Sequence, residues 1–330
     1  MRGPRRRAIV TAAALGLCVA LVLAGSPAQA ARPRPTGIVF LPNPVVVLQD
    51  QTLADDRDAD SPAFAPAYQT VRLYNLDHSG YLQGAFASVC AQQCAFRARE
   101  QYRYHRSDDG FEQVMAYYAV TKAQRYLRSL GFADVNAEQQ DIVIRAGLDN
   151  SFYDPNRDQL LFGRGGVDDA EDMDIIWHEY GHAIQDDQVP GFGGGGDARA
   201  VGEGFGDYWA FTMSEPVTPV DPACIADWDS VTYSTDVPHC LRRVDLDLTV
   251  DDATGEPHHD GQIWSRALYD IHNQLGREVT DHIVIEAQFS FAVDTSMAQA
   301  ARATVATALV LYGSSAANTV ERAFEDRGII

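Results

Sequence analysis

The period of the hydrophobic and polar positions changes near residue 110. Before that point, short apolar runs alternate with turns rich in proline, glycine and aspartate, a pattern that predicts β-strands. The strand candidates here and shortly after are residues 37–48, 70–76, 80–89, 141–147 and 159–163. From Gly110 onward, apolar residues recur at helical spacing, which predicts a helix over 111–131 that Gly131 closes.

The helical pattern continues to the C-terminal end of the chain. A helix that includes residues 175–188 is predicted to start in an acidic first turn at 168–172, which suits its positive N-terminal end. Further helices are predicted near 198–213, 262–275, 281–291, 296–311 and 317–326. The fold class is therefore α+β, with a β-rich N-terminal half and a mainly helical C-terminal half.

The first thirty residues have the features of a secretory signal peptide. Four arginines precede an apolar run of about 17 residues, and the stretch ends in Ala28-Gln29-Ala30. We therefore predict a secreted protein, with no membrane attachment after cleavage. Residues 31–109 form a β-rich region that is either a lobe or a short pro-segment, and residues 110–330 form the catalytic region described below.

The chain is acidic, with a formal net charge of −20. The four leader arginines carry positive charge, so the remaining 300 residues carry −24. Such a surface argues against nucleic acid or an anionic membrane as a partner. We expect a monomer that acts on a protein or peptide substrate.

Four cysteines remain after the leader, and an even number in an exported chain predicts two disulfides. Three connectivities exist, of which we predict the local pairs Cys90–Cys94 and Cys224–Cys240. A cysteine metal site is disfavoured because no second closely spaced pair is present.

The predicted helix at 175–188 carries the chain's most informative spacing. His178 and His182 are four residues apart and therefore share one helix face, with Glu179 beside them. Two imidazoles can bind one zinc ion, and an adjacent carboxylate can take a proton from zinc-bound water. Glu203, 21 residues after His182, can supply the third ligand, and Asp207 can hydrogen-bond a ligand histidine from behind.

The stretches "HEYGHAI" and "GEGFGDYWA" resemble those of thermolysin-like zinc metallopeptidases, and the fungalysin family most of all. In contrast, Gln185 and Gln188 stand where a metzincin requires glycine and histidine. The resemblance implies a two-lobed zincin with one catalytic zinc ion in the cleft. By the same resemblance, the three zinc ligands are His178, His182 and Glu203, the general base is Glu179, and the partner of His178 is Asp207.

Two further stretches resemble the fungalysin family. Residues 149–163 are similar to its edge strand, which pairs with the substrate backbone, and this places Asn150 at a substrate-binding position. The stretch "EPHHDGQIWSRALYDI" resembles the one that supplies a histidine to the transition-state oxyanion, so His258 takes that role, with His259 as the alternative. A substrate-binding arginine is Arg242 or Arg243.

The resemblance predicts a zinc-dependent endopeptidase that hydrolyses peptide bonds with zinc-bound water activated by Glu179. Two departures motivate alternatives: residues 185–200 contain no tyrosine to serve as a second oxyanion donor, and the chain has no room for the family's long prodomain. The alternatives are a zinc-stabilised extracellular binding module without catalysis and a zinc peptidase restricted to oligopeptides.

A calcium site is a weaker prediction. Asn75, Asp77, Ser79 and Gly80 have the spacing of a calcium loop, but its twelfth position holds Phe86 instead of glutamate. A hairpin turn is the preferred interpretation of this segment, with calcium binding as the alternative.

Overall fold

The computed structural model describes residues 33–144 and 149–330, so the predicted signal peptide lies outside the described residues. Residues from Pro33 onward form one compact unit. Among the described residues, every helix is too short or too polar to cross a membrane. The strands are β1 (Thr36–Val39), β2 (Gln69–Arg72), β3 (Ala87–Cys90), β4 (Gln101–Tyr102), β5 (Gln140–Ile144), β6 (Phe152–Asp154), β7 (Gln159–Phe162), β8 (Cys224–Ile225) and β9 (Arg242–Arg243).

The helices agree with the prediction in number and order from residue 110 onward. They are α2 (Gly110–Ser129), α3 (Met173–Gln188), α4 (Gly196–Ser214), α5 (Pro257–Leu275), α6 (Arg277–Gln288), α7 (Met297–Tyr312) and α8 (Ser314–Glu325). A short helix that was not predicted, α1 (Pro44–Leu48), precedes them. Helix α5 begins five residues earlier than predicted. Glu256 explains this start, because its side chain accepts a hydrogen bond from the backbone N–H of His259 and caps the helix.

The strand predicted over 37–48 is wrong in its second half. The strand β1 ends at Val39, and the β-branched run from Val45 onward is helical in α1. Asn43 caps this helix by accepting a hydrogen bond from the backbone N–H of Val46, and Pro44 occupies its first position. The cap and the burial of Val45 and Val46 outweigh the strand propensity of valine.

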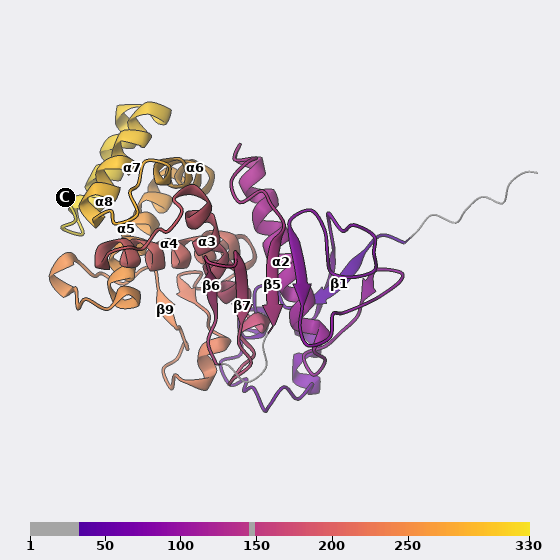
Figure 1. Cartoon of the computed structure of the whole chain (residues 1–330). Helices are drawn as coiled ribbons and strands as arrows, with labels where there is room; N and C mark the ends of the chain where they lie inside the picture. The colour runs from indigo at the N-terminus through magenta and orange to yellow at the C-terminus, as the bar shows by residue number, and fades with distance from the viewer. Residues whose placement is uncertain (1–32, 145–148) are drawn as a thin grey trace, which may run out of the picture. The chain divides into compact units, whose positions relative to one another are not determined.

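Two sheets carry the β-rich half. One has the order β2-β1-β4, and the other has the order β3-β5-β7-β6. In the second sheet β3, β5 and β7 are parallel, whereas β6 is antiparallel to β7 and forms the edge. The edge strand β6 lies next to α3, so one unpaired strand edge borders the helix that carries both histidines (Figure 1).

Helix α2 is the structural link between the sheets and the helical half. It contacts β1, β3 and β5 on the strand side and α3 on the helical side (Figure 1). Trp177 of α3 is fully buried and donates its indole N–H to the backbone oxygen of Ala119 in α2, at 3.1 Å. This contact holds the histidine-bearing helix against the sheet layer.

Helices α3 and α4 approach closely because glycines face each other between them. A Cβ atom on Gly181 would lie 3.1 Å from the Cα of Gly206, and one on Gly206 would lie 2.8 Å from the ring of His178. Any side chain at Gly206 would therefore displace the imidazole of His178. The close packing is a requirement of the site and not only of the fold.

Residues 33–109 are attached to the helical half at the start of α3. Asp172 caps α3 by accepting the backbone N–H of Asp174, and it also accepts Asn43 Nδ2 at 3.1 Å. The backbone N–H of Met173 donates to the carbonyl of Pro42. The acidic stretch before α3 is therefore a buried junction, and the helix itself begins only at Met173.

Candidate metal centre

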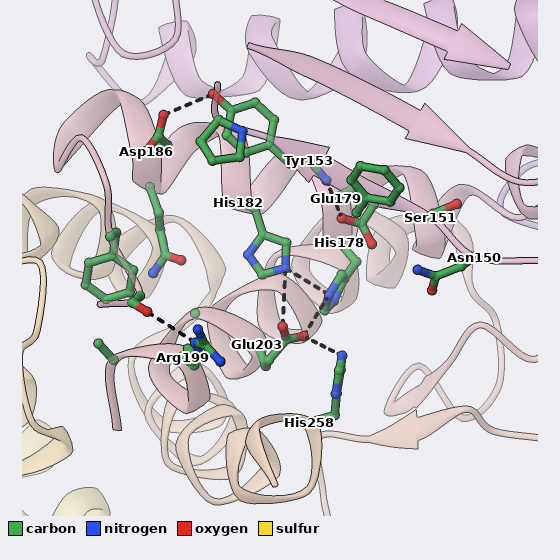
Figure 2. Close-up of a pocket in the computed structure, with 17 residues that line it drawn as sticks. Asn150, Ser151, Tyr153, His178, Glu179, His182, Asp186, Arg199, Glu203 and His258 are labelled. Atoms are coloured by element: carbon green, nitrogen blue, oxygen red, sulfur yellow. Dashed lines mark hydrogen bonds and ion pairs between the residues drawn. The ribbon is translucent and has the colours of Figure 1, made fainter. Parts of the chain in front are cut away.

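Three predicted ligands converge between α3 and α4. His178, His182 and Glu203 each offer one ligand atom, and these atoms all lie within 4.8 Å of one another. The Nε2 atoms of the two histidines are 3.2 Å apart, and His178 Nε2 is 3.2 Å from Glu203 Oε2 (Figure 2). Within the described ranges, no other group of three histidine, cysteine or acidic side chains is arranged this closely.

The donor set fits a divalent cation. His178 can donate its Nδ1 proton to Asp207 Oδ1 at 2.9 Å, which leaves the Nε2 lone pair directed at His182 and Glu203. Glu203 Oε2 is buried and has no hydrogen-bond partner among the described residues. Two imidazole nitrogens and a carboxylate are a ligand set that zinc accepts in catalytic sites.

The electrostatics of the centre favour bound positive charge. Burial lowers the pKa of His178, but the neighbouring carboxylates of Asp207 and Glu203 outweigh burial and raise this pKa to about 10. Burial raises the pKa of Glu203, yet the neighbouring His182 and His178 produce a net decrease. The carboxylates therefore stabilise a positive charge between the imidazoles, and a metal ion can replace the proton there.

Asp207 is held from a second side by Arg242. The Arg242 guanidinium donates Nε to Asp207 Oδ2 at 2.7 Å and Nη2 to Asp207 Oδ1 at 2.8 Å. Burial raises the pKa of Asp207, but the charge of Arg242 and the hydrogen bond with His178 outweigh it and lower that pKa. Asp207 is therefore an anion with fixed orientation behind His178.

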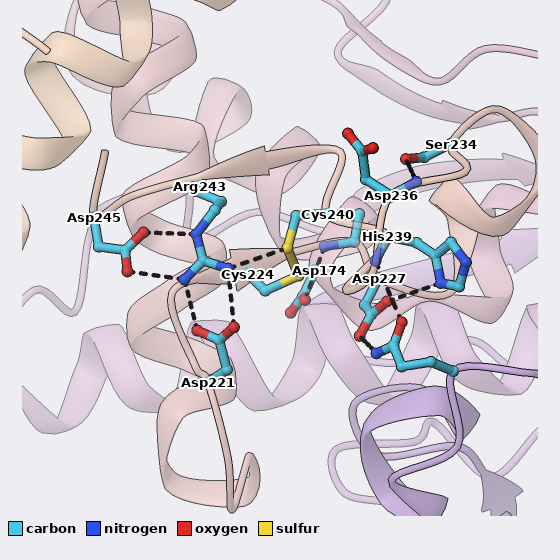
Figure 3. Close-up of a disulfide and its surroundings, with 12 residues drawn as sticks. Asp174, Asp221, Cys224, Asp227, Ser234, Asp236, His239, Cys240, Arg243 and Asp245 are labelled. Atoms are coloured by element: carbon cyan, nitrogen blue, oxygen red, sulfur yellow. Dashed lines mark hydrogen bonds and ion pairs between the residues drawn. A yellow bond between two sulfur atoms is a disulfide. The ribbon is translucent and has the colours of Figure 1, made fainter. Parts of the chain in front are cut away.

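The alternative arginine lies away from the centre. Arg243 donates to Asp221 and to Asp245, beside the disulfide between Cys224 and Cys240 (Figure 3). It lines neither of the two cavities next to the histidines. Of the two predicted arginines, only Arg242 lies at the site.

Both predicted disulfides are confirmed. Cys90 pairs with Cys94 at the end of β3, and Cys224 in β8 pairs with Cys240 just before β9. The second bridge attaches the short strand that carries Arg242 to the segment after α4 (Figure 3).

Glu179 lies between the histidines and the edge strand. Its Oε2 accepts the backbone N–H of Tyr153 in β6 at 3.1 Å, and its carboxylate lines a cavity of about 560 Å³ (Figure 2). The same cavity is lined by His178, His182 and Glu203. The carboxylate therefore faces the space into which a substrate would enter. The sequence contains no signal for this contact, because Tyr153 contributes only its backbone N–H.

The structure distinguishes the two adjacent histidines in the first turn of α5. His258 Nε2 is 3.5 Å from Glu203 Oε2, and its Nδ1 is 2.7 Å from Glu256 Oε1. Its imidazole lines the cavity, as Figure 2 shows. His259 instead places Nδ1 3.1 Å from Asp260 Oδ1 and does not line the cavity. Of these two histidines, only His258 is placed to reach a group bound beside the predicted metal ligands.

Asn150 lies just before the edge strand and lines the cavity together with Ser151 and Phe152. Arg199 of α4 also lines it, a residue that the sequence interpretation did not single out. A second cavity of about 330 Å³ shares Asn150, Glu179 and His258 with the first. The sequence did not predict that acidic residues line this second cavity, because these residues come from separate segments of the chain.

Comparison with known proteins indicates the family and the fold of the chain. The sequence model described as fungalysin metallopeptidase (M36) matches residues 100–329. Among solved structures, the precursor of protealysin, a metalloproteinase from Serratia proteamaculans, is similar over 78% of this chain and 92% of that chain, with a TM-score of 0.59 and 17% identity. At this identity the likeness concerns the fold, and it confirms the predicted two-lobed, thermolysin-like α+β architecture. None of the curated proteins compared with the chain matches it.

Proposed function

The chain belongs to the fungalysin metallopeptidase family and is a zinc metallopeptidase, and on that premise we propose that it is a secreted endopeptidase. In this proposal, His178, His182 and Glu203 hold the zinc ion. The observation that carries it is the convergence of these three ligands beside the Glu179 carboxylate, at the wall of one cavity. The predicted leader and the two disulfides support secretion.

Zinc, when bound, lowers the pKa of a water molecule and polarises the carbonyl of the peptide bond. Glu179 accepts the proton of the attacking water and delivers it to the nitrogen of the leaving amine. Its contact with the Tyr153 backbone holds one carboxylate oxygen in place at the wall of the cavity.

The remaining residues bind the substrate and stabilise charge. An extended peptide lies along the edge of β6 that does not pair with β7, where the N–H of Tyr153 already donates to Glu179. Asn150, just before this strand, donates to the peptide backbone. His258 donates a hydrogen bond to the oxygen of the cleaved carbonyl as negative charge develops on it. Asp207 keeps the Nδ1 proton on His178, and Arg242 keeps Asp207 in position.

The decisive experiment is Glu179→Gln, assayed on casein with zinc content measured in parallel. We expect the variant to retain zinc and to lose hydrolysis by about 10²–10⁴-fold, the usual contribution of a general base. Glu138→Gln is the matched control, because Glu138 is exposed and does not line the cavity. A Glu179→Gln variant that cleaves casein at the wild-type rate would disprove the mechanism.

The two alternatives give different results in the same assay. A non-catalytic binding module would leave casein and short peptides intact, with or without a chelator. An oligopeptide-restricted peptidase would cleave short peptides and leave casein intact. Chelator-sensitive cleavage of casein supports the endopeptidase and excludes both.

A further inference from the structure

The second cavity, of about 330 Å³, opens beside the candidate metal centre. Its lining includes His178, Glu179 and His258, so whatever occupies it lies next to the reacting bond. Ile175 and Leu241 give the cavity an apolar part. The space therefore has the position of a pocket for a substrate side chain adjacent to the cleaved bond.

Three carboxylates line this cavity: Asp149, Asp169 and Asp229. Asp229 is 3% exposed and Asp169 is 4% exposed. Within the described part of the chain, the carboxylate of Asp229 accepts only the hydroxyl of Tyr233, at 3.2 and 3.1 Å, and the same hydroxyl lies 3.4 Å from Asp149. Asp169 accepts the backbone N–H of Gly163 and the Ser151 hydroxyl through Oδ2, whereas its Oδ1 is buried without a partner among the described residues.

Among the described residues, none of these three carboxylates is paired with a cation. Across residues 33–144 and 149–330, no lysine or arginine forms an ion pair with any of the three aspartates. Arg242 also lines the cavity, but its Nε and Nη2 donate to Asp207. Burial raises the pKa of Asp169 to about 6, and burial together with the charges of Asp169 and Asp172 raises that of Asp229. The three carboxylates of the pocket are therefore without an ion-pair partner among the described residues, although Arg242 lines the same cavity.

We propose that this cavity selects substrates carrying arginine or lysine immediately beside the cleaved bond. The inference rests on the proposed peptidase function and specifies its substrate class. The guanidinium group is planar and presents several N–H donors, which suits carboxylates on different walls. The aliphatic stem of the same side chain would pack against Ile175 and Leu241.

A long cationic side chain fits the pocket better than a metal ion. The three aspartates do not bring their oxygens within 4.8 Å of one another, since among the described residues only His178, His182 and Glu203 form such a group. One ion therefore cannot contact all three carboxylates, whereas a side chain with several donors can bridge them.

The test uses fluorescence-quenched octapeptides that differ at one position beside the scissile bond. Arginine is compared there with citrulline, which has nearly the same shape without the charge, and each flanking position is varied in turn. Cleavage sites are identified by mass spectrometry. We expect kcat/KM for arginine to exceed that for citrulline by about tenfold or more at one of the two positions.

Single substitutions test whether the preference for arginine depends on this cavity. Asp229→Asn should reduce the arginine-to-citrulline ratio of kcat/KM several-fold, and Asp169→Asn should do the same. Asp251→Asn removes the same charge at an exposed site outside the pocket and should leave the ratio unchanged. Melting temperatures and zinc content verify that each variant is folded, and the wild-type comparison is informative even if a variant fails to fold.

The outcomes separate this inference from the function on which it rests. If no peptide is hydrolysed, the proposed function is wrong. If all peptides are hydrolysed and arginine has no advantage over citrulline at either position, only the charge-selective pocket is wrong. An arginine preference that survives unchanged in both aspartate variants would also overturn the assignment to this cavity.

Discussion

His178 Nδ1 lies 2.9 Å from Asp207 Oδ1, and both side chains are buried. The carboxylate accepts the only proton of a neutral imidazole, so the opposite nitrogen must present its lone pair to the space shared with His182 and Glu203. Arg242 binds the other side of the same carboxylate. This chain of contacts connects a short, disulfide-anchored strand to the candidate metal centre.

Asp207→Asn should therefore weaken zinc binding. We expect the affinity to fall about 10–100-fold, because the amide carries no charge and leaves Arg242 buried without its partner. Competition with a chromophoric chelator measures the change. Asp134→Asn, at an exposed position without side-chain contacts, is the control and should not alter the affinity. An unchanged affinity in Asp207→Asn would show that another group orients His178.

The two histidines of α5 provide a matched pair for the oxyanion role. His258→Ala should lower kcat on a peptide substrate by about 10²–10³-fold, because a hydrogen bond that forms fully only in the transition state is lost. His259→Ala should change kcat by less than about threefold, since His259 contacts Asp260 and does not line the cavity. Steady-state kinetics on one peptide distinguishes the two. Equal losses in both variants would indicate a structural effect on the first turn of α5.

The environment of Asp58 predicts that the stability difference between Asp58→Asn and the wild type depends on pH. Burial, followed by the charges of Asp168 and Asp55, raises its pKa from 3.8 to about 6 in the folded chain. The folded state then binds more protons than the unfolded state between about pH 4 and pH 6, so this group costs stability as the pH rises through that window. Asp58→Asn removes the cost, which is fully present above pH 6.

We expect Asp58→Asn to stabilise the protein by about 1 kcal/mol at pH 7.5, because water screens this partly exposed carboxylate. At pH 4 the variant and the wild type should unfold at nearly the same temperature. Thermal unfolding at both pH values measures the difference. A stabilisation of equal size at pH 4 would assign the effect to a cause other than the charge of Asp58.

A substitution at Arg106 tests how firmly residues 31–109 are joined to the helical half. Its guanidinium is fully buried and binds Glu171 at 3.0 Å and Asp55 at 2.6 Å, across the junction between the β-rich region and the helical half. Arg106→Ala leaves the Glu171 carboxylate buried without this partner, and we expect a loss of about 3–5 kcal/mol in the free energy of unfolding. Denaturant unfolding measures the loss, with exposed Arg103→Ala as the control.

The same contacts support the interpretation of residues 31–109 as a lobe rather than a removable pro-segment. If they are a lobe, the active enzyme retains them and unfolds in a single transition. The intact mass of the active, exported protein checks this interpretation. A mass that begins near residue 110 would contradict it.

Local patterns in the sequence predicted the elements whose signals are short-range. The helical spacing of apolar residues predicted α2 and the C-terminal helices, and the four-residue interval between His178 and His182 placed both on one face of α3. The local cysteine pairs were also predicted correctly, since each joins residues close in sequence. The valine run after Asn43 was predicted wrongly because the cap and the burial of its side chains outweigh strand propensity.

The sequence by itself therefore determined the α+β class, the helix that carries two histidines and a glutamate, and the identity of the third-ligand candidate. Only the tertiary structure placed His258 and not His259 at the cavity, placed Arg242 and not Arg243 at Asp207, and brought Asp169 and Asp229 into one pocket. Spacing along a helix fixes which residues share a face, so it can be read locally. Which faces of separate segments meet depends on packing between parts of the chain that are distant in sequence, and no local pattern encodes it.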